Sequence, residues 1–377
     1  MYQPLSALLY LRRNLGRTVP ITLVILFSVV MVASVVTVVR SINLTVYTLY
    51  GYNRFTTGVI PRNALTVDEA IVAAIRKQPD LGELAPVHSY TCLLRTIFGR
   101  LVFPIFGLES ADRDLLMQRC HVNLAAGRLP NEGQPEAIIS DFVAHNLGVK
   151  IGDVLLEPDS EDAFAPVKVK LVGTLAGDVW LGLTSKAFVD ANSPFTWQGY
   201  LAFARSPRRQ TILDAEMERV NDKAHARLWR FRNLVKETEN SLTNLYLMLN
   251  IVIGIVVSVI SFVCGLLSNI YFTQRLPEVA TLSAIGYSRG FLLLRAARET
   301  LVLCSVGWIL GAITTVALMT LIRDFVLAPR GLLLNAIDPR AYTLTIPLPL
   351  FIVVFAIVTV SVRLSRLDPV SIIERRA

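Results

Sequence analysis

Residues 19–39 read VPITLVILFSVVMVASVVTVV, about twenty residues without a charged side chain. A helix of this length spans roughly 30 Å, the thickness of the hydrocarbon core of a bilayer. Three arginines precede it: Arg12, Arg13 and Arg17. Because positive charges stay on the cytoplasmic side, we expect a cytoplasmic amphipathic segment over 1–18 and a first transmembrane helix over 19–40. A cleaved signal peptide is the rival interpretation, but its apolar region is usually shorter.

Three further apolar blocks follow in the second half of the chain. We expect a stalk and second transmembrane helix over 241–272, a third over 294–322 and a fourth over 344–362. The segments 273–293 and 363–377 are rich in arginine, so both are predicted to be cytoplasmic, and residues 323–343 then form an extracytoplasmic loop. Four crossings place both termini in the cytoplasm of an inner-membrane, multi-pass protein.

Residues 41–240 have the texture of a water-soluble domain, with prolines, glycines and mixed charges at the spacing of turns. Helices are predicted over 67–77 and 211–224, and short strands over 137–140 and 167–172. About 200 residues are enough for an independent core. The predicted fold is therefore a membrane α-helical protein of four transmembrane helices, with an extracytoplasmic α+β domain inserted between the first and second.

The chain is 53% hydrophobic and has a formal net charge of +8. A basic protein can bind nucleic acid, but these arginines gather beside the apolar blocks instead of alternating with aromatic residues. Membrane topology accounts for that distribution, so no nucleic-acid partner is expected, and membrane lipid is the expected surrounding. No charged residue lies near the centre of a block, which argues against an ion-coupled carrier.

A search for catalytic and metal-binding motifs finds no G-x-S-x-G, no H-E-x-x-H and no phosphate-binding G-x-x-x-x-G-K-[ST]. No cysteine pair has the spacing of a zinc site. We therefore expect no enzyme activity, no metal and no bound cofactor. Cys92 and Cys120 both fall in the predicted outer domain, where a disulfide between them stays open, because the sequence does not give the distance between them.

Residues 275–288 read RLPEVATLSAIGYS, between the second and third blocks. Pro277 suits the first position of a helix, and Glu278 suits the positive end of its dipole. Gly286 suits a left-handed stop, and Ser288 suits the cap of the next helix. The pattern predicts a short helix along the cytoplasmic face, whose simplest role is to anchor the loop at the interface.

This segment resembles the cytoplasmic segment of the FtsX/MacB class of ABC-transporter permeases. The likeness lies in an Arg-x-x-Glu pair, a following leucine, an Ala-hydrophobic-Gly triplet and a glutamate on the next helix. The matching residues are Arg275, Glu278, Leu282, Ala284, Ile285, Gly286 and Glu299. The Leu-Pro-Glu around Pro277 and the Gly-Tyr-Ser that follows are most similar to the DevC-like branch. The order of one span, an outer domain and three spans is also that of the class.

The resemblance implies that this segment docks onto a separate ABC ATPase subunit, which binds the ATP, and that the permease dimerises with a second copy or a paralogue. It further implies mechanical transmission to the outer domain, for export of a lipid, peptide or drug, with a periplasmic adaptor (membrane-fusion) protein as a further partner. An FtsX-like regulator of a cell-wall hydrolase and a membrane-tethered receptor without an ATPase are the alternatives.

Two features of the third block concern helix packing. Gly307 and Gly311 form a G-x-x-x-G, a spacing that lets helices approach closely, within the chain or in a dimer. Glu299 either pairs with Arg295 four residues earlier or faces a partner subunit.

Overall fold

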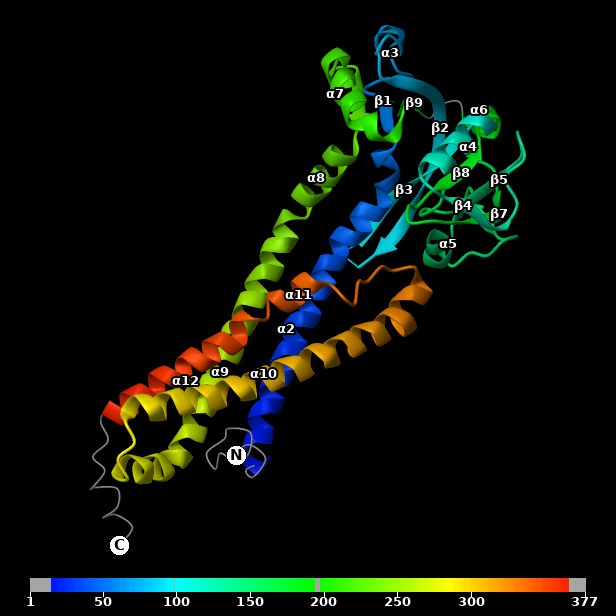
Figure 1. The fold of residues 1–377 in the computed structure, drawn as a ribbon. Coiled ribbons are helices and arrows are strands. Elements are labelled where there is room, and N and C mark those ends of the chain that lie inside the picture. The colour runs from blue at the N-terminus through cyan, green and yellow to red at the C-terminus, as the bar shows by residue number, and fades with distance from the viewer. Residues whose placement is uncertain (1–14, 98, 194–196, 366–377) are drawn as a thin grey trace. The chain divides into compact units, whose positions relative to one another are not determined.

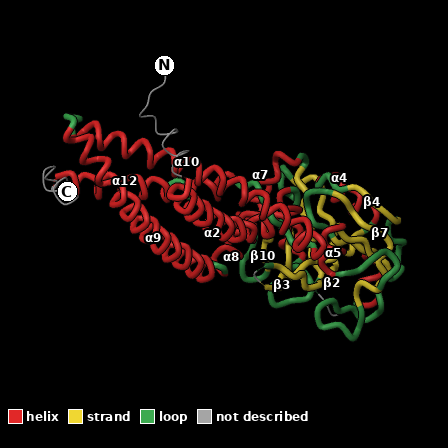
Figure 2. Tube along the Cα trace, turned by 90° about the horizontal axis from the view of Figure 1, so that it is seen from below, coloured by secondary structure: helices red, strands yellow, loops and turns green. Residues whose placement is uncertain are grey.

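The computed structural model describes residues 15–97, 99–193 and 197–365, and the side chains of several helical residues beyond 260 are not described. The chain divides into two compact units. The helical unit contains residues up to 40, 244–322 and those from 335 onward. The sheet domain contains residues 41–243 and 323–334. Figure 2 shows that the strands gather in the sheet domain, while the long helices carry none. The predicted N-terminal segment and C-terminal tail lie almost wholly outside the described residues.

The helical unit is built from long apolar helices: α2 (Leu15–Leu49), α9 (Thr243–Ala284), α10 (Arg289–Ile322) and α12 (Pro347–Ser365), with a short α11 (Pro339–Thr343) (Figure 1). Within the described residues, three spans are long and apolar enough to cross a membrane: Thr18–Leu49, Thr243–Ile260 and Gly290–Arg330. Helix α12 overlaps the predicted fourth block, 344–362, but it is not among these three spans. The count of four transmembrane helices therefore stays a prediction.

Helix α12 packs against α10, and Trp308 Nε1 of α10 donates to Thr345 Oγ1, in the turn just before α12, at 2.9 Å. A cluster of buried side chains fills the interior of the unit: Ile25, Val32, Val36, Cys304, Ala341 and Ile352. At one end, Arg40 on α2 forms an ion pair with Asp338, whose side chain also caps α11 by accepting from the Arg340 N–H. The cap therefore fixes where α11 begins and holds it to α2.

Helix α9 corrects the expectation of a separate short helix starting at Pro277. It runs without interruption through 42 residues to Ala284, so Pro277 lies inside it. A proline inside a helix lacks the N–H that would donate four residues back, and it usually kinks or ends the helix. Here the helix continues on both sides of Pro277, and the stop comes only at Gly286.

The sheet domain contains one sheet of ten strands, in the order β10-β1-β9-β2-β3-β8-β5-β7-β4, with β6 paired to β7. The strands are β1 (Thr57–Pro61), β2 (Leu81–Thr96), β3 (Gly99–Leu108), β4 (Asn123–Gly127), β5 (Glu136–Ser140), β6 (Val154–Leu156), β7 (Val169–Ala176), β8 (Gly182–Ser185), β9 (Gln198–Ala204) and β10 (Ala226–Trp229). The long hairpin of β2 and β3 lies at the centre and joins the two halves.

Short helices accompany the strands: α3 (Glu69–Arg76), α4 (Ser110–Arg119), α5 (Asp141–Leu147), α6 (Lys186–Asn192), α7 (Gln210–Val220) and α8 (Phe231–Ser241). The helices expected over 67–77 and 211–224 are confirmed as α3 and α7, and the strands expected over 137–140 and 167–172 as β5 and β7. Asp68 begins α3, because its side chain accepts from the Ala70 N–H at 2.8 Å.

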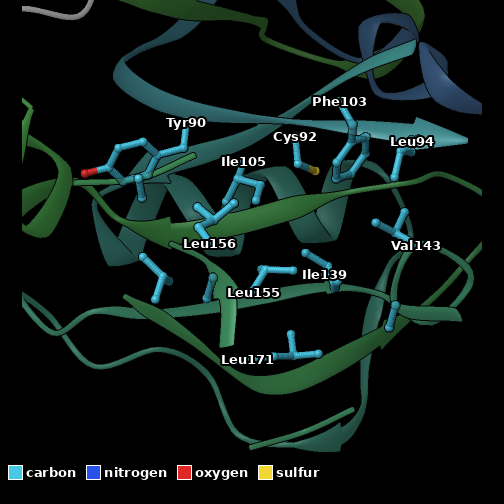
Figure 3. Packing of buried hydrophobic residues seen from close by; sticks show 14 of the residues in the cluster. Tyr90, Cys92, Leu94, Phe103, Ile105, Ile139, Val143, Leu155, Leu156 and Leu171 are labelled. Atoms are coloured by element: carbon cyan, nitrogen blue, oxygen red, sulfur yellow. The ribbon is translucent and has the colours of Figure 1, made fainter. Parts of the chain in front are cut away.

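Three clusters of buried apolar side chains form the core of the sheet domain. Figure 3 shows the first, where Phe103 and Ile105 of β3 face Ile139, Leu155 and Leu171. Cys92 belongs to this first cluster, whereas Cys120 belongs to the second, beside Leu116 and Val122. Helix α2 ends in the first cluster, because Leu49 is 1% exposed and packs there.

Within the sheet domain, the end of α2 and the start of α8 share an aromatic contact. Tyr47 and Phe231 meet edge to face with ring centroids 5.6 Å apart. The guanidinium of Arg54 lies 4.6 Å from the centroid of the Phe231 ring. This cation–π arrangement links the last turn of α2 to the helix that precedes α9.

Candidate functional site

The turn between α9 and α10 is closed by two caps. Gly286 has φ +103°, in the left-handed region that favours glycine. The Tyr287 N–H donates to the Leu282 carbonyl at 3.2 Å. This is the 6→1 hydrogen bond of the Schellman motif, which commonly ends a helix. Ser288 Oγ accepts from the Phe291 N–H at 3.3 Å and so begins α10. The predicted stop at Gly286 and cap at Ser288 are therefore confirmed.

Apolar side chains are exposed on this turn. Ile285 is 70% exposed, and Tyr287 and Phe291 are 38% and 44% exposed. The two aromatic rings stack with centroids 5.2 Å apart and planes 25° apart. Together, Ile285, Tyr287 and Phe291 form what we call the apolar knob. Its side chains are held on a short, doubly capped turn, so it presents a defined surface at little further loss of conformational entropy.

The other residues of the predicted coupling segment lie on the last turns of α9. Arg275, Pro277 and Glu278 are inside the helix and Ala284 is its final residue, but their side chains are outside what the structure describes. Leu282 is partly buried. The structure therefore brings Leu282, Ala284, Ile285 and Gly286 to one helix end, beside the apolar knob. Docking of these residues onto an ATPase stays a prediction.

Glu299 occupies a different environment. It is 1% exposed on α10, and its Oε1 accepts from Arg295 Nε at 3.1 Å. The side chain of Arg295 is 17% exposed. The pairing with Arg295 that the sequence allowed is thus confirmed. Because Glu299 is buried inside the helical unit, its side chain is not part of the surface of this chain, and its role in coupling to an ATPase stays a prediction.

Gly307 and Gly311 lie on the face of α10 that packs against α2 of the same chain. A Cβ at Gly307 would meet Ile25 Cγ2 at 2.8 Å, and one at Gly311 would meet Val29 Cβ at 2.8 Å. Such contacts are shorter than van der Waals distance, so only glycine permits this approach. The G-x-x-x-G is used within the chain, and its role in a dimer stays a prediction.

The disulfide between Cys92 and Cys120 is not formed. Both thiols are free and buried, in separate core clusters. Burial raises the pKa of each thiol to about 12, so neither is a nucleophile at neutral pH. In the part of the chain that the structure describes, no group of three or more histidine, cysteine or acidic residues is placed to hold a metal ion.

Sequence reasoning missed the partnership of Tyr287 with Phe291. The spacing of four residues between two aromatics was visible, and pairs four apart meet on a helix surface. Tyr287 lies in the turn rather than in a helix, however, so the periodicity alone did not indicate the stack.

Residues 250–369 match the family described as "FtsX-like permease C-terminal". The match spans most of α9, the capped turn, α10 and α12. This part of the chain is therefore similar to the C-terminal part of FtsX-like permeases. The resemblance inferred from residues 275–299 is therefore confirmed at the level of the FtsX/MacB-type permeases, and the assignment to the DevC-like branch stays a prediction.

Solved structures similar to this chain include extracytoplasmic regions of other proteins. The periplasmic region of MacB from Actinobacillus actinomycetemcomitans is 11% identical, with 49% of this chain and 92% of that chain covered and a TM-score of 0.30. The extracellular domain of the transporter YknZ from Gram-positive bacteria is 14% identical, with coverage of 44% and 91% and a TM-score of 0.28. A domain of a Porphyromonas gingivalis protein titled a putative permease is 15% identical, with coverage of 46% and 86% and a TM-score of 0.25. At these TM-scores the likeness adds no weight to a function. No curated protein matches the sequence.

Proposed function

We propose that this permease couples ATP hydrolysis by a separate ABC ATPase subunit to movement of the sheet domain outside the cytoplasm. The observation that carries the proposal is the continuity of α9. Its 42 residues correspond to about 63 Å of continuous helix, measured along its axis, which begins one residue after α8 and ends at the capped turn. Displacement of the turn along the helix axis would therefore reach the residues next to the sheet domain.

Docking of the ATPase would use the apolar knob together with Leu282 and Gly286. Exposed Ile285 offers an anchor of the kind that fills a pocket on a partner, and burying such a side chain contributes about 1.5–3 kcal/mol. The charges at Arg275 and Glu278 would set orientation and association rate more than affinity. ATP would be bound by the partner, and this chain would hold no cofactor.

The remaining parts of the proposal follow from the arginine distribution and from the family. The permease would cross the inner membrane four times with both termini cytoplasmic, and would work as a dimer with a second copy or a paralogue. The cargo class is a lipid, peptide or drug, handed to a periplasmic adaptor. The polar-poor helices support transmission of movement over conduction through the spans.

The test is a matched pair of substitutions assayed on the tagged full chain purified from its native membrane. Ile285→Asp should reduce co-purification of the ATPase and the ATPase rate by about tenfold or more, since each 1.4 kcal/mol is tenfold. Ile337→Asp is the control, because Ile337 is 65% exposed but lies in the loop predicted to be on the other side. Equal effects of both variants, or no ATPase with the wild type, would leave a receptor without an ATPase as the better function.

A further inference from the structure

The loop that joins α10 to α11 is folded as part of the sheet domain. It comprises a π-turn at Arg323–Leu327, a 3-10 turn at Ala328–Arg330, and residues 331–334. Its own hydrogen bonds run from the Gly331 N–H to the Ala328 carbonyl at 3.0 Å and from the Leu332 N–H to the Leu327 carbonyl at 2.9 Å. Leu333 packs on the first core cluster. Connecting loops usually run over the surface with few such contacts, whereas this loop is fixed by its own hydrogen bonds and by packing on the core.

One side-chain amide joins the loop to two other segments of the sheet domain. Asn146 of α5 is 7% exposed. Its Oδ1 accepts from the Arg95 N–H at 2.9 Å, and its Nδ2 donates to the Arg95 carbonyl at 2.8 Å. The same Nδ2 lies 3.3 Å from the Arg330 carbonyl and 3.2 Å from the Gly331 carbonyl. Figure 1 shows this loop next to α5.

The position accepts only an amide of this length. One side chain must supply both a hydrogen-bond donor and an acceptor here, because one backbone N–H and three backbone carbonyls face it. An aspartate would keep the acceptor for Arg95 but would set a carboxylate oxygen against three carbonyl oxygens. An alanine would leave buried backbone groups without partners, which is strongly unfavourable.

Gly331 adds a second and independent constraint on the same contact. It has φ +58°, and a Cβ there would lie 2.4 Å from the Phe142 carbonyl oxygen and 2.6 Å from the Asn146 nitrogen. The loop backbone therefore touches the backbone of α5, with no room for a side chain between them. Asn146 and Gly331 each require the loop to sit on α5.

We propose that Asn146 fastens the loop 323–334 to the sheet domain, so that α10 is a further arm along which the sheet domain and the helical unit exchange movement. Asn146 is a positioning residue in this scheme. The attachment of the loop by Asn146 does not depend on the proposed function. The transmission of movement along α10 does rest on the proposed function. The chain passes between the two units at 40–41 and 243–244, and again at 322–323 and 334–335 on either side of the loop, so a loop held on the sheet domain makes the end of α10 a further link.

The test is hydrogen–deuterium exchange on the full chain with its co-purified ATPase, without nucleotide and with a non-hydrolysed ATP analogue. Asn146→Asp and Gly331→Ala should each speed exchange of the Gly331 and Leu332 amides by roughly tenfold or more, while β3 and β5 stay protected. Two controls match these changes. Gly133→Ala has a similar left-handed φ of +72° with no atom within 4 Å. Asn192→Asp removes a single donor bond inside α6, to the Phe188 carbonyl. Neither control should alter the loop.

The nucleotide comparison decides the second half. In the wild type, ATP analogue should change exchange at the end of α10, and Asn146→Asp should lose at least half of that change while ATP is still hydrolysed. Unchanged loop exchange in Asn146→Asp and Gly331→Ala would refute the attachment whatever the function. A released loop with a wild-type nucleotide response would refute the arm. If the wild type shows no nucleotide response anywhere, the proposed function and the arm fail together, while the loop data still decide the attachment.

Discussion

Replacing Gly307 and Gly311 with alanine tests how α10 packs on α2. Added Cβ atoms would lie 2.8 Å from Ile25 Cγ2 and from Val29 Cβ, where carbon atoms in contact normally stay about 3.5–4.0 Å apart. The helices would therefore have to separate by roughly 0.7–1.2 Å. Overpacking of this kind costs about 1–3 kcal/mol, against a gain of about 1 kcal/mol when alanine replaces glycine inside a helix.

The net expectation for Gly311→Ala is a loss of about 0–2 kcal/mol. The matched control is Gly254→Ala on α9, where no atom lies within 4 Å of the new Cβ, so only the gain of about 1 kcal/mol applies. The difference between the two variants should be about 1–3 kcal/mol. The double variant Gly307→Ala/Gly311→Ala should exceed either single one but not their sum, because one helix displacement relieves both contacts.

The assay is thermal unfolding of the detergent-solubilised full chain, followed by the fraction that remains monodisperse at each temperature, at two protein concentrations. Lower stability of the glycine variants at both concentrations is expected for packing within one chain. If they match Gly254→Ala, the close approach of α10 to α2 is refuted. If they are destabilised only at the lower concentration, the glycines act between two copies instead.

Three shorter predictions concern single side chains. Glu299→Gln should destabilise the helical unit by about 3 kcal/mol in thermal unfolding, because Arg295 is left without its buried counter-ion. Arg323→Gln, which breaks an exposed ion pair, should leave thermal unfolding almost unchanged. Burial raises the pKa of Asp214 despite hydrogen bonds from Thr57 and Gln210, so the folded state holds its proton to higher pH than the unfolded chain does. The protonated carboxyl therefore contributes its whole stabilisation below the ordinary Asp pKa of about 3.9, and this contribution is lost as the pH rises through the raised pKa of the folded state. Asp214→Asn should make the melting temperature depend less on pH between pH 4 and 8, whereas Asp159→Asn should leave that dependence unchanged. Cys92 and Cys120 should resist maleimide at neutral pH until the chain unfolds, and an oxidant should not join them; rapid labelling of the folded protein would contradict their burial.

Features set by neighbouring residues were predictable from the sequence. The stop at Gly286 and the cap at Ser288 each depend on a few adjacent residues, and the pairing of Arg295 with Glu299 depends only on helical periodicity. The apolar blocks were visible for the same reason, because a bilayer requires a continuous run of about 20 apolar residues.

Pro277 led to an error because local preference was overridden. Proline favours the first turn of a helix, so the sequence indicated a new helix there, whereas α9 continues through it. A helix already propagating on both sides can keep a proline at the loss of one hydrogen bond, while starting a new helix carries the larger penalty of nucleation.

The attachment of the loop could not be predicted, because its partners are distant in sequence. Asn146 and Gly331 are separated by 185 residues, and Asn146 precedes a helix stop where asparagine is unremarkable. Likewise, the separation of Cys92 and Cys120 into two clusters depends on which face of the sheet each element covers. Such facts depend on the tertiary fold, which neither periodicity nor spacing records.

The number of chain connections bears on how a sheet domain can move. A body connected at two points can still rotate about the line that joins them, so a pull along one helix turns it without moving the other. The contact of Tyr47, Arg54 and Phe231 already ties the start of α8 to the end of α2 inside the sheet domain. If Asn146 holds the loop as we propose, the end of α10 is a third point at which the chain is tied to the sheet domain, and a pull along α9 can no longer be absorbed by that rotation alone. Within the helical unit, the ion pair between Arg40 and Asp338 joins α2 to the cap of α11, so it ties two of the segments that lead toward the sheet domain to each other. Displacement of α9 would on this argument be shared among α2, α9 and α10, whose chain passes directly into the sheet domain, which favours a concerted movement over the swing of a single stalk.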